Sequence, residues 1–101
     1  MLWALAREHE AGLVDFCRRL IRTPSMSGEE GALAELVLAE LARFGYDEAR
    51  TDAVGNVIGL VRGTGQGPSL MFNTHLDHVD PGDPARWSFP PYAATLHEGE
   101  I

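Results

Sequence analysis

The sequence predicts a small α/β domain, because two helical apolar patterns are followed by segments rich in β-branched residues. The 101 residues are 45% apolar and 23% charged, which is the composition of an ordinary globular protein. A chain of this length forms one domain at most and lies near the lower limit for a single hydrophobic core. No internal repeat or low-complexity tract interrupts the pattern.

The first predicted helix spans residues 2–21. With one gap at His9, its apolar side chains recur in threes and fours and form a stripe along one side: Leu2, Leu5, Ala6, Leu13, Phe16, Cys17, Leu20 and Ile21. The helix is expected to end by Arg22, because Pro24 disfavours the helical conformation for the residue before it. We expect His9 to be packed or half-exposed and Cys17 to be a buried, unreactive thiol.

The second predicted helix begins with a capping box at Ser27 and Glu30. The Ser27 hydroxyl is expected to accept a hydrogen bond from the Glu30 amide, and the Glu30 carboxylate to accept one from the Ser27 amide. Five apolar residues supply the buried side of this helix: Leu33, Leu36, Val37, Leu41 and Phe44. Gly45 fits the left-handed conformation that often follows a helix end.

Three strands are expected after Gly45. Residues 46–52 are predicted to hold a short edge strand. Residues 54–61 are predicted to form a strand covered on both faces, because the segment is β-branched and nearly all apolar. Residues 70–75 follow a Gly-rich connection and are predicted as the next strand. The connection is too short for a helical crossover, so this strand should run antiparallel to 54–61 if the two are neighbours.

The C-terminal part is predicted to be an ordered loop and a hairpin. Residues 80–91 are rich in proline, which favours a loop, and Trp87 and Phe89 are expected to pack it down. Residues 93–101 are typical of the start of a hairpin that turns at positions 98–99, with His97 at the surface. Two helices and three buried strands need more cover than the chain provides, so we expect it to be the front portion of a larger α/β domain.

The charge and the hydropathy pattern exclude several classes of partner. The formal net charge is −7, whereas nucleic acids and anionic membrane surfaces are bound mainly through clustered cations. No apolar run approaches the roughly 20 residues of a membrane span, and the N-terminus lacks a basic leader. The single cysteine, Cys17, indicates a reducing compartment. We therefore expect a cytoplasmic protein with no nucleic-acid or membrane partner.

The one dense cluster of chemically useful side chains runs from His75 to Asp83. If a strand continues through it, His75 and Asp77 point the same way where the strand enters its loop. An imidazole suits Zn²⁺ or Co²⁺, and a nearby carboxylate can either bind the metal or hold the ring. The alternative is an acidic loop with His75 hydrogen-bonded in the core. His78 is expected to turn away as a loop or packing residue, and Asp80 and Asp83 to be solvated or to form turns.

Two other local patterns have simpler explanations. Residues 63–67 are Gly-rich but precede a strand, and no Lys-Ser/Thr pair follows, so the segment is not a phosphate-binding loop. Ser25 and Ser27 stand near a predicted helix start, where capping explains them without nucleophile chemistry.

The order of the motifs along the chain is more specific than any one of them. An amphipathic helix leads into PSMSGEE at 24–30, a strand carries GNV at 55–57, HLDHVDP stands at 75–81, and WSFPPY at 87–92. From about Val14 onward the chain resembles the N-terminal part of the M20 metallopeptidase family. That family includes acetylornithine deacetylase, succinyl-diaminopimelate desuccinylase, aminoacylases and related dipeptidases. The His-x-Asp-x-Val stretch is the most specific element of the resemblance.

The resemblance implies a zinc-exopeptidase-like three-layer domain with a mixed sheet, of which residues 1–101 would be the N-terminal portion of the catalytic domain. His75 would bind one of two zinc or cobalt ions, and Asp77 would orient its ring without binding metal. The reaction would be hydrolysis of an amide bond in an N-acyl amino acid or short peptide, with a metal-activated water and a Glu as general base. A lid domain that completes a homodimer would lie outside this chain.

Two departures from the family pattern bear on activity. His78 stands where an aliphatic residue is common, and the remaining ligands and the general base are expected beyond Ile101. We therefore expect residues 1–101 alone to bind metal weakly and to hydrolyse no amide. One alternative is a non-catalytic interaction domain that pairs through an open sheet edge. Another is a mononuclear metal-binding module that uses His75, Asp77 and Asp80.

Overall fold

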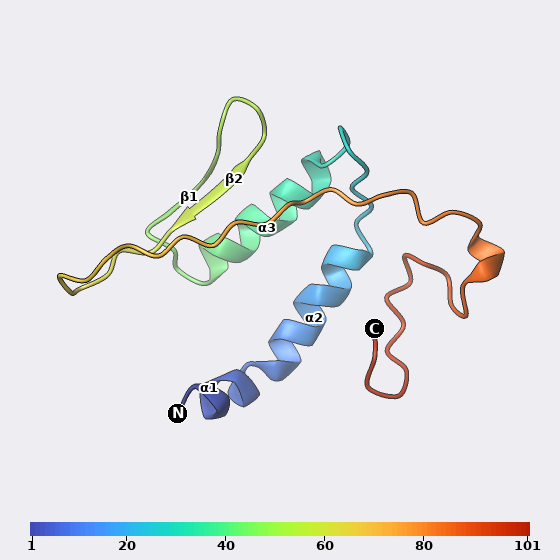
Figure 1. Ribbon diagram of the computed structural model, residues 1–101, viewed down its shortest axis with the longest axis horizontal. Coiled ribbons are helices and arrows are strands. Elements are labelled where there is room, and N and C mark those ends of the chain that lie inside the picture. The colour runs from blue at the N-terminus through green and yellow to red at the C-terminus, as the bar shows by residue number, and fades with distance from the viewer. The chain divides into compact units, whose positions relative to one another are not determined.

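The computed structural model describes residues 1–101, and the chain divides into two compact units. One unit combines Met1–Pro24 with Asp80–Ile101, and the other is Ser25–Val79. Helices α1 to α3, strands β1 and β2, and a short 3₁₀ helix, η1, make up the regular structure (Figure 1). The predicted α/β composition is thus confirmed. No helix combines the length and the apolar character that crossing a membrane requires.

The predicted first helix is in fact two helices. α1 covers Leu2–Glu8 and α2 covers Glu10–Ile21, and the break between them falls at His9, where the apolar stripe has its gap. α2 ends before Arg22, as Pro24 predicts. His9 is exposed, so the expectation that it is packed or half-exposed is wrong. The physical reason is that α1 buries none of its residues and offers no core surface there.

Arg18 of α2 and Arg22, which directly follows this helix, hold the C-terminal segment of the same unit. The Arg18 Nε donates to the Ala94 carbonyl at 2.9 Å, and the Arg22 Nε donates to the Ala93 carbonyl at 3.2 Å. Ala94 is buried. Cys17, which was expected to be fully buried, is only half-buried, because this unit has little core to bury it.

The proline-rich segment forms no α-helix or strand, as predicted, and its two aspartates form turns. The Asp83 carboxylate accepts a hydrogen bond from the Ala85 amide at 3.0 Å and so caps η1, Pro84–Arg86. The Asp80 carboxylate accepts one from the Gly82 amide at 2.7 Å. Both side chains therefore satisfy the backbone of their own loop.

The predicted terminal hairpin is also present. His97 and Glu100 exchange backbone hydrogen bonds at 2.9 and 3.0 Å, and the two residues between them have φ angles of 51° and 85°. His97 lies at the surface, as expected, and its ring contacts that of Phe89, with 5.3 Å between the centroids. The Trp87 Nε1 donates to the Pro81 carbonyl, which ties the loop back on itself.

In the second unit, α3 covers Gly31–Arg43, and its start differs from the prediction. The capping box is absent: the Glu30 carboxylate accepts a hydrogen bond from the Gly28 amide at 2.8 Å, and the Ser27 hydroxyl donates to Asp77. The Ser27 hydroxyl is thus engaged by a residue far along the chain and does not cap the helix. No side chain caps the first turn of α3.

The end of α3 is as predicted, because Gly45 has a φ of 72°. The Gly45 amide donates to the Ala42 carbonyl at 3.0 Å, and the Tyr46 amide donates to the Leu41 carbonyl at 3.2 Å. This pair of bonds is the Schellman motif, which satisfies carbonyls that the helix leaves open. The motif turns the chain back toward α3.

The two predicted strands that follow form an antiparallel hairpin. β1 covers Glu48–Thr51 and β2 covers Val57–Leu60, with Thr51 opposite Val57. The hairpin packs against α3 (Figure 1). β2 is shorter than predicted and half-buried or exposed along its length, so it is not covered on both faces.

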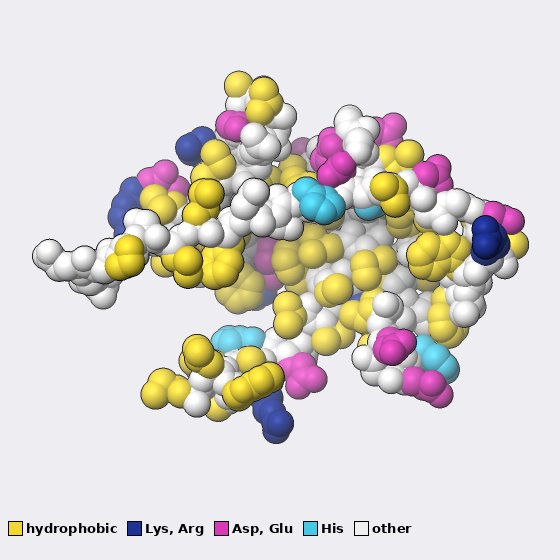
Figure 2. Space-filling view, in the orientation of Figure 1, with side chains coloured by type: hydrophobic (Ala, Val, Ile, Leu, Met, Phe, Trp, Pro, Cys, Tyr) yellow, Lys and Arg dark blue, Asp and Glu magenta, His cyan; other side chains and the backbone are white.

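The third predicted strand, residues 70–75, is not formed. The sheet has two strands only, and Leu70, Met71 and Phe72 are between 79% and 89% exposed. Figure 2 shows many hydrophobic side chains at the surface of the chain. A strand requires a neighbouring backbone for its hydrogen bonds, and no neighbour pairs with this segment. The three-layer arrangement with a mixed sheet is therefore not present in residues 1–101.

Candidate functional site

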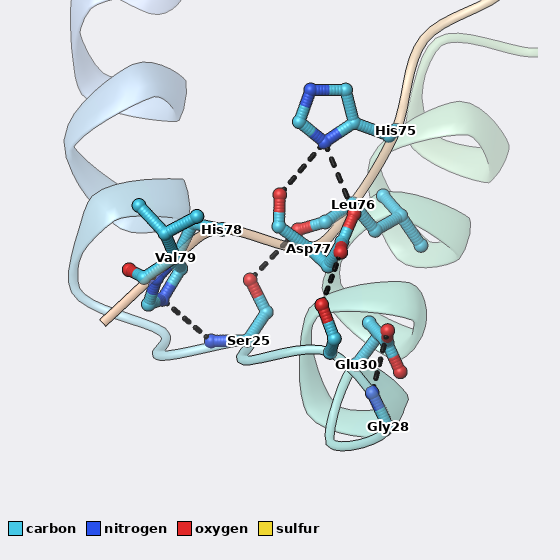
Figure 3. Close-up of polar contacts among 9 residues, drawn as sticks. Ser25, Gly28, Glu30, His75, Leu76, Asp77, His78 and Val79 are labelled. Atoms are coloured by element: carbon cyan, nitrogen blue, oxygen red, sulfur yellow. Dashed lines mark hydrogen bonds and ion pairs between the residues drawn. The ribbon is translucent and has the colours of Figure 1, made fainter.

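Two segments that are distant in sequence lie side by side within the Ser25–Val79 unit. Residues 25–27 and 75–79 form what we call the serine clamp. Met26 and His78 form a parallel bridge, in which the His78 amide donates to the Ser25 carbonyl at 3.0 Å. The Ser25 hydroxyl donates to the Leu76 carbonyl at 2.8 Å (Figure 3). Ser25 is only 2% exposed, so this contact is shielded from water.

Both ring nitrogens of His78 are used inside the serine clamp. The Nε2 atom accepts a hydrogen bond from the Ser25 amide at 3.0 Å (Figure 3). Because an amide nitrogen only donates, Nε2 carries no proton, and Nδ1 donates to the Val79 carbonyl at 2.7 Å. His78 therefore joins the two segments together. It is a packing residue turned away from His75, as expected.

His75 has the opposite character, because only one of its ring nitrogens contacts the protein. Its Nδ1 lies 2.7 Å from the Asp77 carbonyl oxygen and 3.1 Å from Asp77 Oδ1. Both partners are acceptors, so Nδ1 carries a proton, and in the neutral ring Nε2 keeps the lone pair. The His75 side chain is 80% exposed, and Figure 3 shows the rest of its ring directed away from Asp77. Metal-bound histidines commonly have this protonation pattern.

Asp77 stands between His75 and Ser27. Its Oδ2 accepts a hydrogen bond from the Ser27 hydroxyl at 2.5 Å, while Oδ1 faces the His75 ring. The bond from Ser27, together with the contact with His75, holds the pKa of Asp77 below its ordinary value. The carboxylate is thus kept ionised, which suits a group that accepts from an imidazole. His75 and Asp77 meet because the backbone bends at Leu76, between them. The strand that was expected to align them is not formed.

The residues present do not complete a metal site. Nowhere in the chain do three or more His, Cys, Asp or Glu side chains gather so that they could hold a metal ion. Asp80, whose carboxylate accepts from the Gly82 amide, belongs to the other unit. The side chains of His75, Asp77 and Asp80 therefore do not come together as a three-ligand metal module would require. The donor set fits a single metal–imidazole bond with an oriented ring, and it does not fit a two-metal centre.

Sequence reasoning assigned Ser25 and Ser27 to helix capping and so missed their roles in the clamp. One signal could have identified them. Residues two apart in an extended segment point to the same side, so the pair Ser25 and Ser27 can present both hydroxyls to a neighbouring segment. The PSMSGEE motif that contains them was interpreted as a helix start and as part of the resemblance to the M20 family.

Two curated relatives of the chain carry a name that assigns no activity. No family model and no solved structure matches the chain. Two curated relatives are both named "Uncharacterized protein YgeY", one from Escherichia coli strain K12 and one from Escherichia coli O157:H7. Each is 32% identical over 88 residues, which is 86% of this chain and 21% of the relative. The chain thus spans about a fifth of the length of these relatives.

Proposed function

We propose that this chain is the N-terminal part of the catalytic domain of a metal-dependent amide hydrolase of the M20 kind. In this proposal His75 is a metal ligand and Asp77 orients its ring. The observation that carries the proposal is the contact of His75 Nδ1 with Asp77, which in the neutral ring leaves the lone pair on Nε2 of an exposed side chain. The His-x-Asp-x-Val motif, which contains both residues, supports the same assignment.

The proposed metals are zinc or cobalt, two ions in the complete enzyme. When bound, they would activate a water and stabilise the charge that develops on the amide oxygen of an N-acyl amino acid or short peptide. The chain's own contribution is limited to binding and orientation. His75 supplies a lone pair from Nε2, and the ionised Asp77 keeps the proton on Nδ1. The same proposal includes a lid domain, a homodimeric state and a cytoplasmic location. The cytoplasmic location is inferred from the single free cysteine, Cys17.

One observation favours a second candidate, a non-catalytic interaction domain. Leu70, Met71 and Phe72 form an exposed apolar run, and the two-stranded sheet has an unpaired edge on each strand. Exposed apolar runs and open strand edges are common places for another polypeptide to bind. This candidate needs no metal, and it leaves the His75 and Asp77 contact without a function.

The test is a Zn²⁺ titration of the full chain by calorimetry, with His75→Ala and His97→Ala as a matched pair. Both histidines are exposed, with side chains 80% and 61% accessible, but only His75 is held by a carboxylate in the clamp. We expect weak binding that is lost in His75→Ala and kept in His97→Ala. Equal binding by the two variants would contradict the metal role of His75 and would favour the interaction domain.

A further inference from the structure

We propose that Ser27 is a positioning residue for His75: its hydroxyl fixes the Asp77 carboxylate in the orientation that places the proton of the neutral His75 ring on Nδ1 and leaves the lone pair on Nε2. The inference rests on the proposed function, in which that Nε2 binds the metal. Ser27 bonds to Asp77, which in turn contacts His75, so Ser27 would touch neither metal nor substrate. Its effect would be transmitted through the carboxylate.

The orientation of the Asp77 carboxylate depends on its hydrogen-bond partners. The terminal torsion of an aspartate side chain is broad, so a carboxylate without a partner turns freely. Ser27 holds Oδ2 of Asp77 at 2.5 Å, and Oδ1 is then left facing His75 Nδ1 at 3.1 Å. Each oxygen has one assigned partner. Removal of the Ser27 hydroxyl frees the carboxylate to rotate away from the imidazole.

The backbone around Ser27 is held by contacts that do not involve the Ser27 hydroxyl. The Ser25 hydroxyl, the Ser25 amide and the Met26–His78 bridge join the two segments on one side of Ser27. On the other side, the Glu29 amide donates to the Met26 carbonyl at 2.7 Å. Loss of the Ser27 hydroxyl therefore leaves the serine clamp closed, and its effect should be confined to Asp77 and His75.

The Asp77 carboxylate in turn affects the tautomer of His75. Two Asp77 oxygens, one on the backbone and one on the side chain, accept from Nδ1. The side-chain contact is charge-assisted and therefore the stronger kind of hydrogen bond. With the carboxylate free, only the carbonyl favours a proton on Nδ1. The ring should then become a mixture of its two neutral tautomers.

The test is nitrogen NMR of the histidine rings in the metal-free, ¹⁵N-labelled full chain, at a pH where imidazoles are neutral. In the wild type, His75 and His78 should both carry the proton on Nδ1. In Ser27→Ala, His75 should become a mixture of tautomers while His78 stays unchanged. Ser27→Thr, which keeps a hydroxyl, should restore the wild-type pattern of His75.

Two results would overturn the inference. If His75 is unchanged in Ser27→Ala, the hydroxyl does not set the tautomer. If the signals of His75 and His78 both change, Ser27 holds the whole clamp and has only a structural role. His78 thus reports folding of the clamp in the same spectrum, and a variant that opens the clamp is recognised directly.

A Zn²⁺ titration in the same spectra separates this inference from the proposed function. Ser27→Ala should lower the affinity for Zn²⁺ about tenfold, as followed by the shift of the His75 signal. This is the lower end of the effect known for partners of metal-bound histidines. A change of tautomer with no Zn²⁺ effect on His75 in the wild type would support positioning and contradict the metal role. An unchanged tautomer with Zn²⁺ bound at His75 would contradict positioning alone.

Discussion

Ser25 is the most buried polar side chain of the serine clamp, and its hydroxyl satisfies the Leu76 carbonyl at 2.8 Å. Ser25→Ala removes the donor and leaves a shielded acceptor without its partner. We expect a loss of about 1–3 kcal/mol in the free energy of unfolding, measured by urea denaturation followed by circular dichroism.

Ser69→Ala provides the matched control for Ser25→Ala. Ser69 is exposed in the Gly-rich connection, so this change should stay within about 0.5 kcal/mol of the wild type. Equal stability of the two variants would mean that the Ser25 hydroxyl does not stabilise the clamp.

At the scale of residues, only part of the site could be predicted from the sequence. His75 and Asp77 stand two positions apart, so a local pattern was enough to pair them. The partner of Ser27 lies 50 positions along the chain, and no local pattern contains that information. The capping box had the correct residue types at the correct spacing, but Asp77 is the group that binds the hydroxyl.

At the scale of elements, the β1–β2 turn depends on one carboxylate. Asp52 accepts hydrogen bonds from the Val54 amide, the Asn56 amide and the Asn56 side chain, at 3.0, 2.9 and 2.8 Å. The Asn56 side chain and backbone make the largest contributions to lowering the Asp52 pKa from its ordinary 3.8. Because the ionised form makes these bonds, protonation of Asp52 weakens the turn.

This pKa shift predicts a pH dependence with a defined sign. The folded-state pKa of Asp52 is lower than the unfolded-state value, so its contribution to stability is complete above that value. The contribution is lost as the pH falls through the folded-state pKa. We expect Asp52→Ala to be less stable than the wild type at neutral pH, and the difference to shrink below about pH 4.

Urea denaturation of both proteins across this pH range is the measurement. Glu35→Ala, which removes an exposed carboxylate from α3, controls for the change in net charge. A difference between wild type and Asp52→Ala that stays constant down to the lowest pH would contradict the role of the ionised turn.

Elements that end on local signals were predicted well, and elements that need distant partners were not. Pro24 and Gly45 mark the ends of their helices through the backbone conformations that proline and glycine prefer. These preferences can be recognised from the residue types alone. Residues 70–75 have the composition of a buried strand, but a strand exists only beside another backbone. The unpaired segment therefore forms no strand and stays exposed.

At the scale of the whole molecule, the chain has little buried apolar surface. Only Leu33, Ala34 and Ala94 are buried hydrophobic residues, and they are divided between the two units. The residues that could act on a substrate are equally few, since one imidazole and its orienting carboxylate are the only assigned groups. A hydrolytic site requires several ligands and a general base.

We therefore expect residues 1–101 to hydrolyse no N-acyl amino acid or dipeptide in the presence of Zn²⁺ or Co²⁺. The measurement is release of free amine from a panel of such substrates, compared with the metal ions alone. Metal-dependent turnover that disappears in His75→Ala would show that this chain forms a complete site, contrary to the arrangement of its donors.

The proposed metal role of His75 requires that its Nε2 offers a lone pair to a metal ion. Paramagnetic Co²⁺, added to the full chain in substoichiometric amounts, broadens the NMR signals of the side chains nearest to it. We expect the ring signals of His75 to broaden first, ahead of those of His9, His78 and His97. If His9 or His97 broadens as strongly as His75, or if His78 broadens first, then His75 is not the metal ligand and the claim is wrong.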